Sequence, residues 1–195
     1  MVDDLAQVLA ARDPVTAAHS TRVTFLATRL AQWLGWSERR IVELRAAVPL
    51  HDVGKITISA KILHKRGPLD ERELAEIRTH PEAGATLIGT ENSTEDALPY
   101  VLHHHERWDG GGYPSGRAGT SIPPGARLLA VVDAYDAMIS TRPYRRALPR
   151  RHALAEIERC AGTQFDPELA QAFVALIERW RREMRERGNN NLLPK

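Results

Sequence analysis

The feature that most constrains the fold is a histidine pair followed directly by a glycine-rich loop, in the segment His104–Pro114 (HHERWDGGGYP). A His-Asp doublet, His51-Asp52, lies far upstream and has Gly54-Lys55 just after it. Downstream, Asp133 lies inside an apolar segment. Paired imidazoles, a doublet carboxylate and a glycine-rich turn are the parts of a metal centre in a phosphate-handling pocket. The sequence therefore favours a fold that gathers these three segments around one polar site.

The spacing of apolar residues predicts a chain that is almost entirely helical, with no internal repeat and no convincing strand. Start and stop signals place the helices as follows: one ending at Gly35, one from the Ser37 cap to Gly54, one starting at Asp70 with a capping box to Glu73, one starting at His80-Pro81, one over 95–106 and irregular at Pro99, one opening at Pro123-Pro124, and two over about 150–161 and 167–187.

The fold class expected from this pattern is all-α. We expect a single compact helical domain of about seven helices over residues 1–187, with the metal centre in its core. The tail over residues 188–195, which contains three consecutive asparagines, is expected to be disordered. The stretch 107–121 is too long and too rich in glycine to be a simple connector.

Composition excludes several classes of protein. The formal net charge of +2 on 195 residues is too small to predict nucleic acid as a partner. No apolar run approaches the roughly 20 residues that span a bilayer, so no membrane segment is expected. The single cysteine, Cys160, excludes an intrachain disulfide and favours a cytoplasmic location.

Seven ionisable residues lie at predicted helix ends or on apolar faces, where each costs several kcal/mol unless it is paired or binds a metal. They are His19, His51, Asp52, His80, His104, His105 and Asp133. Seven side chains could serve two cations if one carboxylate bridges them, and two metals are the usual device for phosphoester hydrolysis. Each residue alone has a simpler interpretation as a capping, surface or ion-paired group. Asp136, one turn after Asp133, is more often structural at such a position.

The motifs HHE-xx-DG-x-GYP and HD-x-GK resemble those of the HD-GYP domain, the bacterial branch of the HD phosphohydrolases associated with hydrolysis of cyclic di-GMP. The resemblance covers roughly Asp13 to Asp166. It implies one ion on His19, His51, Asp52 and Asp133, and another on Asp52, His80, His104 and His105, with Asp52 as the bridge. The motif register selects His104 and His105, and leaves His103 behind the site or on the surface.

The same resemblance assigns further roles. Lys55 matches a lysine that contacts the scissile phosphate. Val15 stands where some members have a glutamate that holds a third ion, so two ions are expected. A histidine-rich site with carboxylates suits transition metals; the family points to iron or manganese, and zinc and nickel are alternatives.

The expected substrate side depends on the basic segment Arg142-Pro143-Tyr144-Arg145, which matches the family's Arg-Pro-Tyr motif. Arg142 and Arg145 could grip phosphate or a guanine edge, and Tyr144 could stack on a base. Asp13 also matches the substrate side of the family. The alternative is a solvated basic loop. Departures at 58–60, 65–67 and Ile139 put loop conformation and substrate affinity in doubt.

The leading hypothesis is a metal-dependent phosphodiesterase, cytoplasmic, that opens cyclic di-GMP to pGpG, with GMP as a further product. The alternative from another class is a signalling module that binds the cyclic or linear dinucleotide with little turnover. A third hypothesis, an HD enzyme acting on ppGpp or nucleotides, does not need the Gly-Tyr-Pro loop. That loop could contact a regulatory or diguanylate cyclase partner domain, and a homodimer is a further expectation.

Overall fold

The computed structural model describes residues 14–65, 67–89, 96–141 and 146–186. The helices in these ranges are α2 (Pro14–Trp33), α3 (Glu38–Ala47), α4 (Ala60–Leu63), α5 (Glu71–Ile77), α6 (His80–Ile88), α7 (Leu98–His103), α8 (Pro124–Ile139), α9 (Arg150–Arg159) and α10 (Pro167–Glu186), with 3-10 segments η1 (Val48–Leu50), η2 (Val53–Thr57) and η3 (Gly119–Ser121). No strand occurs in these ranges beyond one isolated bridge between Ala161 and Phe165. The all-α prediction is confirmed. The short helix α4 was not predicted.

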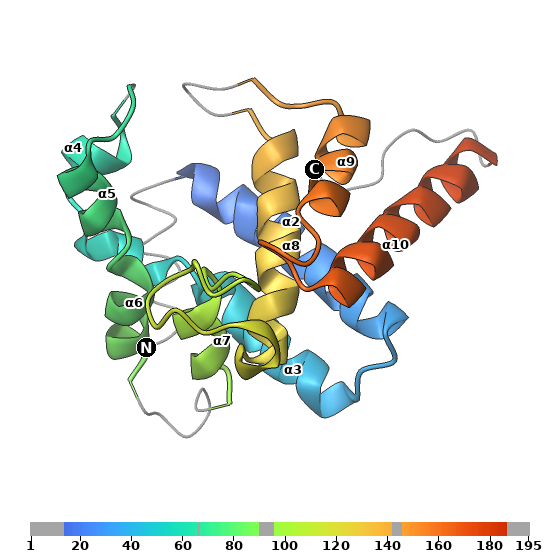
Figure 1. Ribbon diagram of the computed structural model, residues 1–195, viewed down its shortest axis with the longest axis horizontal. Helices are drawn as coiled ribbons and strands as arrows, with labels where there is room; N and C mark the ends of the chain where they lie inside the picture. The colour runs from blue at the N-terminus through green and yellow to red at the C-terminus, as the bar shows by residue number, and fades with distance from the viewer. Residues whose placement is uncertain (1–13, 66, 90–95, 142–145, 187–195) are drawn as a thin grey trace.

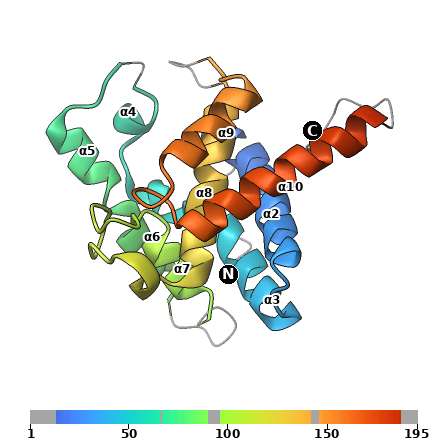
Figure 2. The ribbon, with the colours of Figure 1, turned by 45° about the vertical axis from the view of Figure 1, so that its right-hand side comes forward.

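Helix α8 is the centre of the domain and packs against α2, α7, α9 and α10. Figures 1 and 2 show it crossing α2, with α9 and α10 on one side and α4, α5 and α6 on the other. Its sequence explains this position, since apolar residues occur nearly all round the helix. Tyr135 meets Phe173 of α10 edge to face, with ring centroids 5.0 Å apart. Within the described residues, no helix is both long and apolar enough to cross a membrane.

Two helix ends differ from those predicted, and proline explains the first. The helix expected to reach Gly54 ends at Ala47, because Pro49 has no N–H to continue the α-helical ladder. His51 and Asp52 therefore lie in a turn between η1 and η2. The helix expected over 95–106 is α7, which ends at His103. Pro99 lies in its first turn and causes no irregularity inside it.

The segment η2 packs directly on the start of α6, and glycine makes this approach feasible. A Cβ on Gly54 would overlap the carbonyl oxygen of His80 and lie 2.5 Å from the backbone nitrogen of Gly84. Conversely, a Cβ on Gly84 would lie 3.2 Å from the backbone nitrogen of Gly54. Gly54 is therefore a point of contact between backbones rather than the helix stop that the sequence suggested. The contact brings the Asp52 turn beside the first residue of α6.

Replacement of Gly54 by Ala should destabilise the protein by about 1–3 kcal/mol or more, because the added methyl group forces two backbones apart. Gly67→Ala is the matched control, since no atom lies within 4 Å of its would-be Cβ and its φ is not positive. The control should stay within about 0.5 kcal/mol of the parent protein. Urea unfolding of both variants measures the difference. Equal, small effects would show that the backbones at Gly54 can separate freely.

Candidate metal centre

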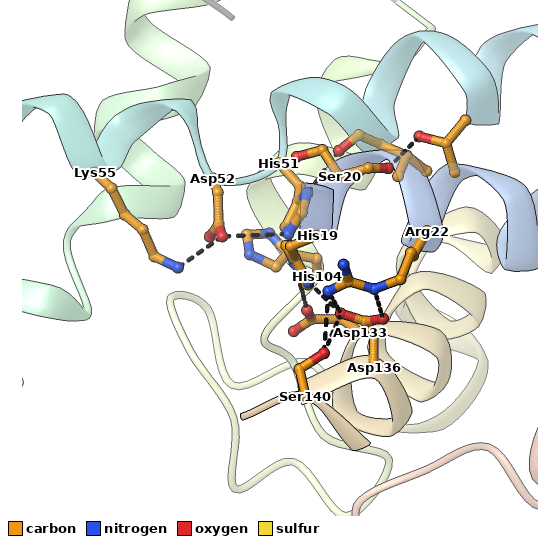
Figure 3. A network of polar contacts seen from close by, with 12 residues as sticks. His19, Ser20, Arg22, His51, Asp52, Lys55, His104, Asp133, Asp136 and Ser140 are labelled. Atoms are coloured by element: carbon orange, nitrogen blue, oxygen red, sulfur yellow. Dashed lines mark hydrogen bonds and ion pairs between the residues drawn. The ribbon is translucent and has the colours of Figure 1, made fainter. Parts of the chain in front are cut away.

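All seven ionisable residues singled out in the sequence come together in two neighbouring groups. One group holds Asp52, His80, His104 and His105, and the other holds His19, His51 and Asp133. Within each group, one possible ligand atom per residue lies within 4.8 Å of all the others. The residues come from α2, the η1–η2 turn, the start of α6, the end of α7 and the middle of α8. Segments more than 100 residues apart in sequence thus meet at one place (Figure 3).

Three of the histidines are oriented in the same way. Each has its Nδ1 within hydrogen-bond distance of the backbone carbonyl three residues earlier: His51 on Val48 at 2.6 Å, His80 on Ile77 at 2.7 Å and His104 on Val101 at 2.6 Å. A carbonyl oxygen can only accept, so Nδ1 carries the proton and donates. The Nε2 atom then presents a lone pair to the interior of the site, which is the arrangement of a metal-ligating imidazole.

The lone pairs at the centre fit a cation. The Nε2 atoms of His80 and His104 lie 3.3 Å apart, and with both Nδ1 atoms protonated neither has a hydrogen to offer the other. The Nε2 atom of His51 is buried and has no hydrogen-bond partner among the described residues. Buried polar atoms without partners are rare, and each costs free energy. A metal ion removes both problems, because imidazole nitrogen is its common ligand.

Asp52 lies between the two groups. Its Oδ2 is 3.5 Å from Nε2 of His51, and its Oδ1 is 3.5 Å from Nε2 of His80. Lys55 donates to Oδ2 at 2.6 Å. Burial alone favours the neutral acid, but Lys55 and the surrounding imidazoles hold the pKa of Asp52 well below its usual value. The two oxygens of one carboxylate therefore face opposite halves of the site, as a bridging ligand requires.

His19 and Asp133 face each other at 3.1 Å, from Nε2 to Oδ1. Burial opposes the charged form of His19, but hydrogen bonds to Asp133 and Asp136 outweigh it and raise the pKa of His19 to about 9. In contrast, burial lowers the pKa of His80 to about 4 and that of His105 to about 3. The proton favoured on His19 sits where a cation would lie between imidazole and carboxylate, so the two compete for one position.

Part of the site is exposed to solvent. The side chains of Lys55 and Asp133 are 28% and 22% exposed, whereas that of His51 is 1% exposed. Tyr113 stacks on His105, with ring centroids 4.9 Å apart. Burial raises the pKa of Tyr113, so its hydroxyl stays protonated and gives it no role as a base. The site is therefore in contact with solvent at Lys55 and at Asp133.

Glu106 was not singled out in the sequence, although it follows the histidine pair directly. Its buried carboxylate accepts from the backbone nitrogens of Ser115 at 2.8 Å and Arg117 at 3.2 Å. Its Oε1 also lies 3.4 Å from Nδ1 of His103, which is buried behind the pair and joins neither group. Glu106 thus ties the glycine-rich loop to the turn that carries His104 and His105.

The loop is also attached to the turn between α9 and α10. The nitrogen of Trp108 donates to the carbonyl of Gln164 at 3.1 Å, and that of Asp109 donates to the carbonyl of Thr163 at 2.8 Å. A Cβ on Gly112 would overlap the backbone nitrogen of Arg107, so glycine is required for the loop to return this closely. The sequence carries no signal for the attachment of the loop to the α9–α10 turn, because each of its two hydrogen bonds joins residues more than 50 positions apart.

Four further residues of the predicted site lie outside the described residues. They are Asp13, Arg142, Tyr144 and Arg145. Asp136, which the sequence favoured as a structural residue, is buried and contacts both His19 and Arg22.

Comparison with known proteins agrees with this geometry. The sequence profile of the HD domain matches residues 4–169. The chain belongs to the HD-domain family. A solved structure, Bd1817, an HDG"Y"P protein from Bdellovibrio bacteriovorus, shares its fold with a TM-score of 0.68 at 21% identity, covering 82% of this chain and 51% of that one. The resemblance to an HD-GYP domain is thereby confirmed.

Two curated relatives are similar in sequence. The cyclic di-GMP phosphodiesterase of Thermotoga maritima is 39% identical over 186 residues, which cover 92% of this chain and 50% of that protein. The 3′3′-cGAMP-specific phosphodiesterase 2 of Vibrio cholerae is 35% identical over 182 residues, covering 92% of this chain and 34% of that protein. The chain spans half or less of the length of these relatives.

Proposed function

We propose that this HD-GYP domain is a metal-dependent phosphodiesterase that hydrolyses cyclic di-GMP to pGpG, with GMP as a further product. The observation that carries the proposal is the convergence of seven ligand side chains in two groups on either side of Asp52. The name of the Thermotoga relative supports the choice of substrate. Another relative is named as specific for 3′3′-cGAMP, so the first property to measure is whether the domain prefers cyclic di-GMP or 3′3′-cGAMP.

We infer two divalent transition-metal ions, iron or manganese, with zinc and nickel as alternatives. One ion is assigned to His19, His51, Asp52 and Asp133, and the other to Asp52, His80, His104 and His105. Bound ions of this kind polarise a phosphate and lower the pKa of a water. The histidines contribute neutral imidazoles with fixed lone pairs, and Asp52 contributes the shared negative charge.

Lys55 is proposed as the residue that touches the phosphate. Its ammonium group lies 2.6 Å from Asp52, and its side chain is 28% exposed. A phosphate that approaches the site at Lys55 would meet this fixed positive charge. This charge would offset the negative charge that grows on the phosphoryl oxygens during hydrolysis, without further rearrangement of the protein.

Substrate recognition is proposed for Arg142, Tyr144, Arg145 and Asp13. The basic segment follows α8 directly, and α8 carries Asp133. The guanidinium groups would pair with phosphate or a guanine edge through two parallel hydrogen bonds. A cytoplasmic location, a homodimer, and contact of the Gly-Tyr-Pro loop with a regulatory or diguanylate cyclase domain belong to the same proposal.

Asp52→Ala should lose both ions and all hydrolysis, because it removes the shared ligand. Metal content by plasma mass spectrometry, and product chromatography with cyclic di-GMP and 3′3′-cGAMP, measure the two effects. The control is Asp96→Ala, since the ion pair of Asp96 among the described residues is with the exposed Arg39. The parent protein should carry about two ions per chain, as two-metal hydrolases do. Full metal content in Asp52→Ala would exclude the bridging role.

Lys55→Gln should keep both ions and lower turnover by roughly 10²-fold, as for the loss of one electrostatic stabiliser. The comparison variant is Lys61→Gln, whose lysine is exposed on α4. Metal content and single-turnover rates are the measurements. Normal turnover in Lys55→Gln would mean that Lys55 does not act on the phosphate and that its role is the ion pair with Asp52.

The double variant Arg142→Ala, Arg145→Ala should bind cyclic di-GMP at least about tenfold more weakly, since each charge-assisted hydrogen bond contributes about 1.5–3 kcal/mol. Cleavage of bis(p-nitrophenyl) phosphate should persist, because it needs only the ions. The matched control removes the exposed charges of Arg182 and Arg185 on α10. Loss of both cyclic di-GMP binding and bis(p-nitrophenyl) phosphate cleavage would instead mean that the basic segment supports the fold. Unchanged cyclic di-GMP binding would mean that the segment is a solvated loop.

A further inference from the structure

The histidines of the centre are not all supported alike. His51, His80 and His104 donate their Nδ1–H to backbone carbonyls. His19 instead donates to a side-chain carboxylate, Asp136 Oδ2, at 2.8 Å. Among the seven grouped residues, all of which lie in the described ranges, His19 is the one histidine with a carboxylate at hydrogen-bond distance from Nδ1. The difference divides the site, because His19 belongs to the half with His51 and Asp133.

Asp136 is held in place by a second side chain of α2. Arg22 donates through Nε to Oδ1 at 2.7 Å and through a terminal nitrogen to Oδ2 at 2.9 Å. The side chain of Asp136 is fully buried, and that of Arg22 is 21% exposed. Both carboxylate oxygens are thus engaged: Oδ1 accepts from Arg22, and Oδ2 accepts from both Arg22 and His19, among others. This fork keeps the carboxylate ionised and fixes its direction toward the imidazole (Figure 3).

A third residue completes the cluster at the end of α8. Ser140 accepts from Arg22 at 3.0 Å and donates to Asp136 Oδ2 at 3.3 Å. The cluster spans α2 and α8, the two helices that supply His19 and Asp133. Rotation of either helix about its axis would therefore break these hydrogen bonds and also change the direction of the His19 imidazole.

A carboxylate that accepts from Nδ1 makes an imidazole a stronger metal ligand than a neutral carbonyl does. Its negative charge favours positive charge on the ring and raises the basicity of Nε2. The half of the centre with His19 combines this imidazole with the carboxylate of Asp133. The other half has three imidazoles, His80, His104 and His105, and no carboxylate except the shared Asp52. The two halves therefore differ in negative charge close to the ion, and the half with His19 has more.

We propose that Asp136, held by Arg22, is a positioning residue that makes His19 a stronger ligand. As a result, the half-site of His19, His51 and Asp133 keeps its cation at free-metal concentrations at which the half-site of His80, His104 and His105 has lost its own. The proposal rests on the two-ion centre proposed above and adds an order of filling. A purely structural role for the Asp136–Arg22 pair predicts no such selectivity.

The test is a titration of the chelator-stripped full chain with Mn²⁺, with bound and free ion separated by equilibrium dialysis and counted. The parent protein should show two sites whose affinities differ by at least about tenfold. Asp136→Asn keeps the size of the side chain but cannot accept from all three donors. It should weaken the tighter site by about 10–100-fold, the usual effect of losing a residue behind a ligand, and leave the weaker site unchanged.

Two variants separate positioning from folding. Glu178→Gln breaks another carboxylate–arginine pair, to Arg181 at 2.5 Å on α10, and neither residue contacts any of the seven ligands. It should leave both affinities unchanged. The double variant Arg22→Met, Asp136→Asn removes the guanidinium that Asp136→Asn leaves unpaired. It should fold where the single variant does not, and show the same selective loss.

The outcomes are distinct. An unchanged tight site in either Asp136 variant overturns the positioning role, and so does an equal loss at both sites. A parent protein that binds fewer than two ions overturns the two-ion centre itself. Co²⁺ gives an independent reading, because its visible spectrum reports the ligands of each filled site. Asp136→Asn should alter the spectrum of the half-site that fills first in the parent protein, and leave the spectrum of the other half-site unchanged.

Discussion

The structure depends on imidazole lone pairs that converge on a buried carboxylate. The carbonyls that fix these imidazoles lie at helix ends: Ile77 is the last residue of α5, Val48 directly follows α3, and Val101 lies in the last turn of α7. Helix ends leave carbonyls without intrahelical partners. The histidines donate to them, so the same hydrogen bonds pair carbonyls at the helix ends and aim the ligands. Repulsion between the inward lone pairs is then the reason that the centre fits a cation.

Close backbone contact brings these helix ends together. The contact of η2 with α6 at Gly54 and Gly84 places the Asp52 turn against His80. On the other side, Glu106 holds the glycine-rich loop against the histidine pair through two backbone N–H groups. In both places a glycine permits the approach and a buried polar group uses it. Gly54 and Gly112 thus contribute to the centre through backbone packing.

Much of this was predictable from the sequence, and the remainder has a common physical cause. Apolar periodicity located α2, α8 and α10, and the motifs selected the seven residues that the structure brings together. The predicted end of α3 was wrong because Pro49 was given too little weight, and the predicted end of α7 lay beyond the observed end at His103. The contact of His19 with Asp136 joins residues 117 positions apart, and that of Trp108 with Gln164 has no local signature. Spacing along the chain predicts local structure, whereas these contacts depend on how helices pack.

The arrangement of support around the centre has a consequence for how its two halves respond to the rest of the domain. His19 is held between α2 and α8 through the charged groups of Arg22 and Asp136. His104 and His105 instead adjoin a loop that is attached at Glu106 and at the α9–α10 turn. Helices α9 and α10 both pack on α8, and α10 also packs on α2. Movement of the C-terminal helices would therefore reach His19 and Asp133 through helix packing, and His104 and His105 through the loop.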